Sequence, residues 1–174
     1  NILGTVLPVR EITAAAHAKG ALVLVDACQM IVHQKVDVRD IGCDFLVFSG
    51  HKTYGPSGIG VLYGRYEILD SMPPYQFGGD MVDTVSYQHT TFEEPPARFE
   101  AGTPAIVQAV GLGRALQYMS DLGMDNIEAH EVELVKYTNE RLKEVKGLKV
   151  IGNADNKGGV FSFNVEGIHP QDLA

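Results

Sequence analysis

Apolar and amphipathic stretches alternate along the first half of the chain. Residues 9–19 place apolar side chains at helical spacing and finish in Lys19-Gly20, which predicts a short amphipathic helix and its stop. Two continuous apolar runs, 21–25 and 45–48, predict strands buried on both faces of a parallel sheet. The segment between them is too long for a tight hairpin and long enough for a crossover. This order of elements indicates the α/β class.

The next segments predict a strand and a long loop. Residues 58–63 follow a tight Gly-Pro turn that is too short for a parallel crossover, so this strand is expected to pair antiparallel with the one before it. Four prolines interrupt residues 72–97, which predicts a loop region without regular elements. Loops of that length are usually functional or interfacial.

Helical patterns return in the last third of the chain. A helix over 104–120 is expected to open with Thr103 as N-cap and Pro104 at the first helical position, and a charged amphipathic helix is expected over 125–146. Two short strands, 148–151 and 160–163, are expected to follow. The change of pattern after residue 122 predicts two domains, residues 1–122 and residues 123–174.

Composition excludes several classes of protein. The 174 residues are 45% hydrophobic and 21% charged, which is typical of a globular domain. The net charge of −8 argues against binding to nucleic acid, and no apolar run is long enough to cross a membrane. Two cysteines without paired spacing fit a reducing compartment, so a cytoplasmic location is expected. Because the chain lacks an initial Met and stops just after a Pro turn, it is expected to be part of a longer protein.

Polar side chains follow both predicted parallel strands. Asp26 and Gln29 follow the first, and Ser49, His51 and Lys52 follow the second. Ligands of open parallel sheets bind at these strand ends. An amine, a carboxylate, a hydroxyl and an imidazole are the groups that bind pyridoxal phosphate (PLP).

Each of these residues also has an ordinary interpretation when taken singly. Asp26 can be a capped strand end, His51 a turn histidine and Lys52 a surface lysine. Five polar groups at two neighbouring strand ends favour the cofactor site instead. Two environments are then expected: a partner for the Asp26 charge, because an unpaired buried carboxylate is costly, and desolvation of Lys52, which would lower its pKa. The scattered histidines lack the spacing of metal ligands, so no metal is expected.

Three motifs resemble one known family. The segments Val25-Asp26-Ala27-Cys28-Gln29, Ser49-Gly50-His51-Lys52 and Arg98-Phe99-Glu100-Ala101-Gly102-Thr103-Pro104 resemble the class V aminotransferase-like PLP enzymes, and within them the cysteine desulfurase and selenocysteine lyase group. The resemblance implies a fold type I PLP-dependent transferase with a mostly parallel sheet. Residues 1–122 would be part of its PLP-binding large domain, and residues 123–174 the start of its small C-terminal domain.

The resemblance also implies a role for each site residue. Lys52 would hold PLP covalently and shuttle a proton, and Asp26 would keep the pyridine nitrogen protonated. Gln29 would hydrogen-bond the phenolic oxygen of PLP. Ser49 and His51 would bind its phosphate.

Further contacts are implied across a homodimer. Thr103 would reach the phosphate of the neighbouring subunit, and Gly78-Gly79-Asp80-Met81 resembles the loop that closes near the partner's active site. The expected substrate is cysteine or selenocysteine, which would leave alanine. A sulfur-acceptor protein, as in iron-sulfur cluster assembly, is a further expected partner.

Some residues of the family pattern have no counterpart in this sequence: the ring-stacking residue, the nucleophilic Cys and the substrate-carboxylate Arg. Cys28 and Cys43 are both expected to be small core residues, so the isolated chain is expected to be inactive. Two alternatives stay open. One is another enzyme of the family, an aminotransferase or a kynureninase-like hydrolase, and the other is a non-catalytic segment that binds PLP or dimerises.

Overall fold

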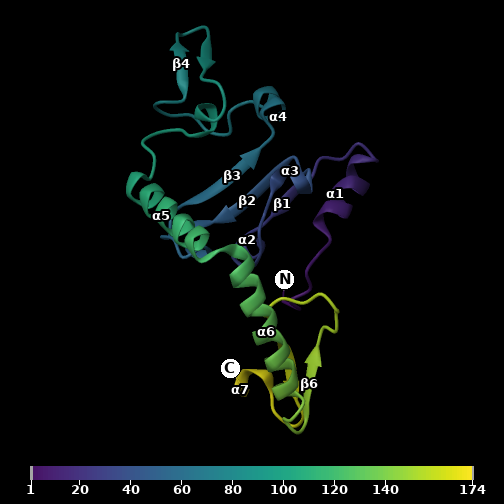
Figure 1. Cartoon of the computed structure of the whole chain (residues 1–174). Coiled ribbons are helices and arrows are strands. Elements are labelled where there is room, and N and C mark those ends of the chain that lie inside the picture. Colours follow the sequence, from purple (N-terminus) through teal and green to yellow (C-terminus); the bar gives the residue numbers. More distant parts are fainter. Residues whose placement is uncertain (1, 174) are drawn as a thin grey trace. The chain divides into compact units, whose positions relative to one another are not determined.

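A computed structural model of the protein describes residues 2–173 (Figure 1). Helices and strands follow each other in this order: α1 (Val9–His17), β1 (Leu24–Asp26), α2 (Met30–His33), α3 (Val38–Ile41), β2 (Phe45–Ser49), β3 (Gly60–Gly64), α4 (Tyr66–Ser71), β4 (Val82–Val85), β5 (Thr90–Phe92), α5 (Ile106–Leu122), α6 (Met124–Leu142), β6 (Leu148–Ile151), β7 (Ser162–Val165) and α7 (Pro170–Leu173). The α/β class expected from the sequence is confirmed.

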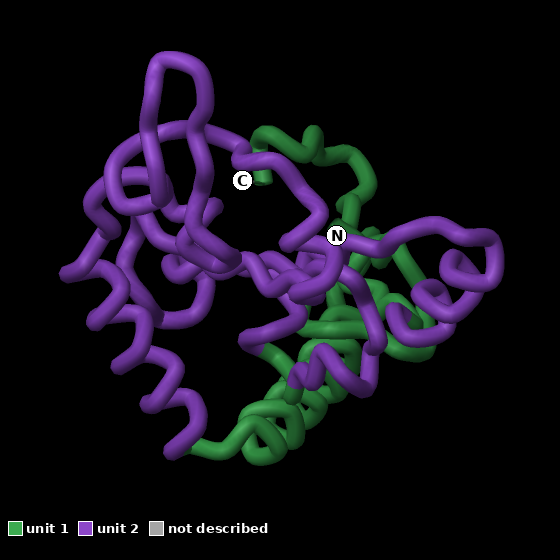
Figure 2. Tube along the Cα trace, turned by 90° about the horizontal axis from the view of Figure 1, so that it is seen from above, with its two compact units in different colours: residues 1–8, 33–35, 122–174 green, residues 9–32, 36–121 purple. Residues whose placement is uncertain are grey.

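The described chain forms two compact units (Figure 2). The sheet unit, purple in Figure 2, comprises residues 9–32 and 36–121. The terminal unit, green, comprises residues 2–8, 33–35 and 122–173. The assignment of 1–122 and 123–174 to a large and a small domain stays a prediction. None of the described helices is long and apolar enough to cross a membrane.

Three strands form the centre of the sheet unit, in the order β1-β2-β3 (Figure 1). β1 and β2 are parallel, with Leu24 opposite Phe45 and Asp26 opposite Val47. β3 runs antiparallel to β2, as the short Gly-Pro connection predicts. The sheet described here is therefore mixed, with one parallel and one antiparallel pairing.

Only one face of this sheet is covered by the described residues. The core consists of Val25, Ala27, Ile41, Cys43 and Leu46, with partly buried side chains from α1 and α3 packed against it. Side chains alternate between faces along a strand, so Leu24 and Leu62 lie on the opposite face, where they are 57% and 54% exposed. The prediction that these strands are buried on both faces is wrong for the described chain.

The helix α1 ends with a backbone motif that the sequence signals. Gly20 adopts a left-handed φ of 74°, and the next N–H, of Ala21, bonds to the carbonyl of Ala16. The Gly20 N–H bonds to the carbonyl of His17. These two bonds form a Schellman motif at the predicted Lys19-Gly20 stop, and the regular helix ends just before it, at His17.

Two local predictions are corrected by the structure. The proline-rich segment 72–97 contains an antiparallel hairpin of β4 and β5, which projects from the three-stranded sheet (Figure 1). Its turn is closed by the Ser86 hydroxyl, which donates to the carbonyl of His89 and accepts from its N–H. The helix α5 begins at Ile106, so Thr103 is not its N-cap. The Ile106 N–H instead bonds to the carbonyl of Pro104 in a tight turn.

The terminal unit contains its own small sheet and a long helix. β6 and β7 pair antiparallel, with Leu148 opposite Val165, two residues beyond the predicted end of the second strand. On α6, Glu131 accepts hydrogen bonds from the His33 ring at 2.8 and 2.9 Å. An open cavity of about 500 Å³, lined by both apolar and polar side chains, lies between α6 and the β6 hairpin.

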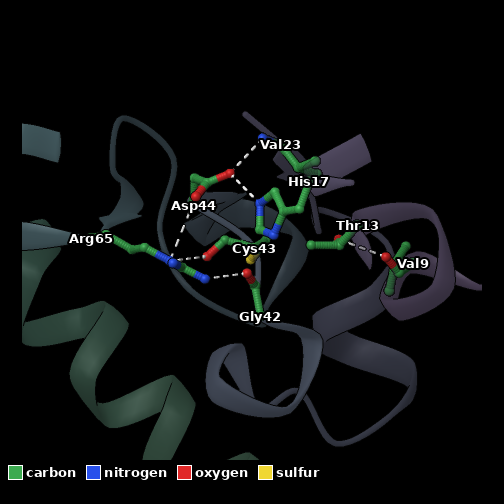
Figure 3. A network of polar contacts seen from close by, with 8 residues as sticks. All are labelled: Val9, Thr13, His17, Val23, Gly42, Cys43, Asp44 and Arg65. Atoms are coloured by element: carbon green, nitrogen blue, oxygen red, sulfur yellow. Dashed lines mark hydrogen bonds and ion pairs between the residues drawn. The ribbon is translucent and has the colours of Figure 1, made fainter. Parts of the chain in front are cut away.

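A buried carboxylate fixes the base of the three-stranded sheet (Figure 3). The Asp44 side chain is only 4% exposed and lies just before β2. It accepts hydrogen bonds from His17 Nε2 at 2.8 Å and from the Val23 N–H at 2.7 Å. Arg65 Nε lies 3.6 Å from its other oxygen. Asp44 therefore connects α1, the start of β1, β2 and the end of β3.

Further hydrogen bonds from Arg65 and the negative charge of Asp44 stabilise this network. The Arg65 guanidinium also donates to the carbonyls of Gly42 and Cys43. Burial by itself would raise the pKa of Asp44, but the hydrogen bonds from His17 and Val23 outweigh burial and hold the pKa below its usual value. The carboxylate is thus ionised in the folded protein at neutral pH.

We expect Asp44→Ala to destabilise the protein by about 3 kcal/mol, because it removes the buried acceptor that connects His17, Val23 and Arg65. Urea unfolding at pH 7 measures this. The matched control is Asp40→Ala, since Asp40 forms an exposed pair with Arg10 and should cost less than about 1 kcal/mol. Equal unfolding midpoints for the two variants would contradict the prediction.

The same interaction predicts a pH dependence with a definite sign. A carboxylate whose pKa is lower in the folded state binds fewer protons there than in the unfolded state. The stabilisation by Asp44 is therefore complete above the ordinary Asp pKa of about 3.9 and is lost as the pH falls through the lower, folded value. As the pH is lowered into the acid range, the free energy of unfolding, measured by urea unfolding, should fall less steeply in Asp44→Ala than in the unsubstituted protein.

Candidate active site

The carboxyl ends of β1 and β2 lie at one edge of the sheet. Asp26 is the last residue of β1 and pairs with Val47, two residues before Ser49 at the end of β2. Side chains two residues apart on a strand point to the same face, so Val47 and Ser49 lie on one face of β2. Because Val47 is opposite Asp26, Asp26 lies on that face as well. Asp26 and Ser49 therefore share the uncovered face of the sheet, at the edge where the sequence predicts a ligand.

The Asp26 carboxylate is held by the residue two positions later. It accepts a hydrogen bond from the Cys28 N–H at 3.0 Å. The Cys28 side chain and this backbone bond lower the pKa of Asp26, with a further contribution from the positive charge of Lys52. Asp26 is exposed, so the burial cost expected from the sequence does not arise in this chain.

Cys28 also contacts the second strand end, which sequence reasoning missed. Its Sγ lies 3.5 Å from the Ser49 hydroxyl. Cys28 is partly exposed, so the prediction that it is a core residue is wrong, whereas Cys43 is fully buried in the core. Burial raises the pKa of the Cys43 thiol. The sequence places Cys28 near Asp26, but only the parallel register brings Ser49 to it.

A tight turn after β2 carries His51 and Lys52. Residues Gly50–Lys52 form one turn of 3₁₀ helix. The buried Thr53 donates through both its N–H and its hydroxyl to the carbonyl of Gly50, and the Gly50 N–H bonds to the carbonyl of Ile59. These bonds fix the backbone that presents the two polar side chains.

Packing behind the turn reinforces it. A Cβ added to Gly55 would lie 3.1 Å from Leu112, a buried residue of α5, and one added to Gly111 would lie 3.2 Å from Pro56. Tyr54 adopts a left-handed φ of 58°, which is uncommon for a residue other than glycine. Its ring meets Tyr118 of α5 edge-on at 6.0 Å. The turn is thus held between β3 and α5.

The environment of Lys52 differs from the expected one. Lys52 and His51 are exposed in the described chain, so the desolvation expected for Lys52 is not present here. Lys52 nevertheless acts electrostatically on Asp26. The structure therefore brings Asp26, Ser49 and Lys52 to one edge of the sheet.

The other two predicted residues, Gln29 and Thr103, lie on separate segments. Gln29 is exposed between β1 and α2. Thr103 is exposed just before α5, and within residues 2–173 no hydrogen bond connects it to the β1–β2 edge. The expectation that Thr103 acts toward a neighbouring subunit stays a prediction.

The donor set at this edge fits PLP by its chemistry. It offers an ionised carboxylate, a primary amine, a hydroxyl and an imidazole, the groups that suit a pyridinium nitrogen, an aldehyde and a phosphate. Among the described residues, no three His, Cys, Asp or Glu side chains gather closely enough to hold a metal ion.

An α/β sheet with these groups at one edge is typical of the PLP-dependent enzymes. The chain belongs to the class-V aminotransferase family, whose sequence profile, described as "Aminotransferase class-V", matches residues 1–174. The family implies PLP as cofactor.

Curated relatives carry a more specific name. The chain is 52% identical over 174 residues to a cysteine desulfurase of Dickeya dadantii, covering 99% of this chain and 42% of that protein. It is 47% identical over 175 residues to a cysteine desulfurase of Haloferax volcanii, covering 100% of this chain and 41% of the relative. The chain thus spans less than half the length of these relatives.

Solved structures agree with the fold. The apo cysteine desulfurase of Thermococcus onnurineus superimposes with a TM-score of 0.94 at 43% identity, over 100% of this chain and 44% of that one. A cysteine desulfurase of Escherichia coli gives a TM-score of 0.91 at 34% identity, over 99% and 43%. The fold type I assignment made from the sequence is confirmed.

We expect Gly50→Ala to disrupt the turn that carries Lys52. A Cβ at Gly50 would lie 2.8 Å from Ile59 Cγ2 and 3.0 Å from two backbone oxygens, so the backbone would have to shift. The cost should be about 1–3 kcal/mol, measured by urea unfolding. Gly113→Ala is the matched control, because a Cβ there meets nothing within 4 Å and should be neutral or stabilising. A fully stable Gly50→Ala variant would contradict the described turn.

Proposed function

We propose that the protein to which this chain belongs is a PLP-dependent cysteine desulfurase, which releases the sulfur of L-cysteine and leaves L-alanine. The main support is the arrangement of Asp26, Ser49 and Lys52 at one sheet edge, in a chain about half identical to relatives named cysteine desulfurase. In this proposal residues 1–122 belong to the PLP-binding large domain and residues 123–174 begin the small domain.

Asp26 and Lys52 have the central roles. Asp26, ionised and held by Cys28, binds the protonated ring nitrogen of the cofactor. Lys52, on its tight turn, would hold the cofactor covalently. Once the amine of the substrate has displaced it, its free amine would take the proton from the α-carbon of the substrate. When bound, PLP supplies a ring that withdraws electrons and stabilises negative charge at that carbon.

The remaining predicted residues bind the cofactor. Ser49 donates its hydroxyl and His51 its imidazole N–H to the phosphate, and Gln29 donates to the phenolic oxygen. Thr103 binds the phosphate of the neighbouring subunit in a homodimer, so two chains complete each site. These roles come from the family resemblance.

The sulfur-accepting thiolate belongs to a part of the protein outside this chain. Cysteine reactivity requires access and a thiolate. Cys43 is fully buried and its pKa is raised. The Cys28 Sγ lies 3.5 Å from the Ser49 hydroxyl, and the Cys28 N–H donates to the Asp26 carboxylate. Cys28 is thus held at the sheet edge and does not lie on a mobile segment that could carry sulfur.

The physiological setting follows from the same proposal. The substrate is cysteine or selenocysteine, and the sulfur passes to an acceptor protein, as in iron-sulfur cluster assembly. One solved relative, a cystine C-S lyase, holds cysteine persulfide as its reaction product and is 27% identical with a TM-score of 0.82. Two free cysteines fit a reducing cytoplasm.

Lysine labelling tests the assignment of Lys52. The full-length protein should absorb visible light with PLP bound, and borohydride should fix PLP on a peptide that contains Lys52. Lys52→Ala should lose the visible absorption, whereas Lys35→Ala, an exposed control, should keep it. Label on Lys19 or Lys35 would show that the assignment is wrong.

The isolated 174-residue chain should give no cysteine desulfurase turnover when PLP is added, because it lacks a reactive thiol. Alanine and sulfide released from L-cysteine measure this, with the full-length protein as positive control. Sustained turnover that disappears in Cys28→Ser or Cys43→Ser would contradict the proposal that the sulfur carrier lies elsewhere.

A further inference from the structure

Two loops of the sheet unit are joined beside the β4–β5 hairpin. The Gly102 N–H donates to the carbonyl of Gly79 at 2.8 Å, and the Glu93 N–H donates to the carbonyl of Met81 at 3.1 Å. The Met81 side chain is fully buried and anchors the first loop. The loop 78–81 and the segment 93–103 therefore form one structure, called the paired loops below.

The approach of the paired loops is close. A Cβ added to Gly78 would lie 3.3 Å from the Ala101 Cβ and 3.4 Å from the Gly102 nitrogen. Gly102 itself adopts a left-handed φ of 83°. The left-handed backbone at Gly102 favours glycine, and the close contact at Gly78 leaves little room for a side chain. The next residue, Thr103, lies on the exposed side.

Arg98 connects the paired loops to the rest of the unit. Its Nε donates to the carbonyl of Glu93 at 2.9 Å, within the same segment. Its Nη1 donates to the carbonyls of Asp70 at 2.7 Å and Met72 at 3.3 Å, and its Nη2 lies 3.3 Å from the Asp70 carboxylate. The side chain is only 16% exposed.

The Asp70 and Met72 oxygens that Arg98 contacts lie at the C-terminal end of α4. The last carbonyls of a helix have no partner within the helix, and they attract positive charge. The planar guanidinium, with donors in fixed directions, can satisfy carbonyls on two segments at once, which a lysine ammonium does less well. Arg98 therefore sets the position of the 93–103 segment relative to α4.

Only a short, hydrogen-bonded path separates Arg98 from Thr103. Residues Ala97–Phe99 form a turn of 3₁₀ helix, and the Glu100 N–H bonds to the carbonyl of Ala97. The next fixed point is the bond from Gly102 to Gly79. A shift at Arg98 would thus be passed to Thr103 within five residues.

We infer that Arg98 is a positioning residue that holds Thr103, through the paired loops, in place for the cofactor phosphate of the neighbouring subunit. This inference rests on the proposed function, because the role of Thr103 does. It goes beyond the family resemblance, which marks Arg98 only as part of a motif. Its specific consequence is that loss of Arg98 impairs the partner's site and leaves the site of its own subunit intact.

Mixed dimers of the full-length protein test this consequence. In the first arrangement one subunit carries both Arg98→Ala and Lys52→Ala, and its partner is wild type. The only Lys52 is then in the wild-type subunit, and the Thr103 that reaches its cofactor phosphate comes from the variant subunit. In the second arrangement Arg98→Ala and Lys52→Ala are on different subunits. The only Lys52 is then in the Arg98→Ala subunit, and the Thr103 that reaches its cofactor phosphate comes from the other subunit, in which Arg98 is intact. The reference dimer carries Lys52→Ala on one subunit.

The readout is PLP affinity, from the visible absorption at the single remaining Lys52. We expect about tenfold weaker PLP binding in the first arrangement, as loss of charge-assisted hydrogen bonds would cause, and binding within about twofold of the reference in the second. Both arrangements contain one copy of each substitution, so a general weakening of the dimer would affect them equally, whereas a folding defect confined to the Arg98→Ala subunit would weaken PLP binding mainly in the second. Arg10→Ala, an arginine with one exposed ion pair, should change neither.

Three results would overturn the inference. Loss confined to the second arrangement would indicate that Arg98 only stabilises its own subunit. Equal loss in both would indicate a general effect on the dimer, and no loss in either would show that Arg98 does not act on the site. If Arg98→Ala yields no dimer, Arg98→Lys replaces it and should give a smaller loss confined to the first arrangement. Thr103→Ala in the same two arrangements checks the proposed function separately. If Thr103→Ala shows no dependence on arrangement, the contact across the dimer is wrong, and the inference fails with it.

Discussion

Asp44 places an ionised carboxylate in the interior of the sheet unit, and the geometry around it depends on how that charge is satisfied. Removing a carboxylate from water costs several kcal/mol unless hydrogen bonds and a cation replace the lost hydration. Here His17, Val23 and Arg65 replace it, and each comes from a different element. The same bonds align the start of β1 with the start of β2.

That alignment determines what happens at the other end of the same strands. With Leu24 opposite Phe45, the parallel register brings Asp26 beside Val47 and leaves Ser49 within reach of Cys28. A shift of one residue would turn Asp26 or Ser49 to the other face of the sheet. The buried charge at the base therefore supports the exposed polar groups at the edge, although they do not touch.

Arginines have comparable roles at two places in the sheet unit. Arg65 reaches the carbonyls of Gly42 and Cys43 next to Asp44, and Arg98 reaches the carbonyls at the end of α4. In both cases a planar, permanently charged group satisfies backbone oxygens that no strand or helix bond uses. Irregular backbone near a site can be held rigid in this way without a large apolar core.

The sequence alone determined the elements that rest on periodicity and local chemistry. Continuous apolar runs predicted β1 and β2, the short Gly-Pro connection predicted the antiparallel β3, and Lys19-Gly20 predicted the end of α1. The family motifs predicted the fold, because Asp26, Lys52 and Thr103 lie in segments that resemble the same family. These features depend on neighbours in the chain.

The tertiary structure decided what depends on residues distant in sequence. Burial could not be predicted from apolar runs alone, since Leu24 and Leu62 are exposed where no described element covers them. The pattern of residues did not predict the β4–β5 hairpin, because prolines flank it and its strands are short. The bonds of Asp44 with His17 and Arg65, and of Arg98 with Asp70, join positions about 20 or more residues apart. No local pattern encodes such pairs, because they form only when the strand register and the turns bring the side chains together.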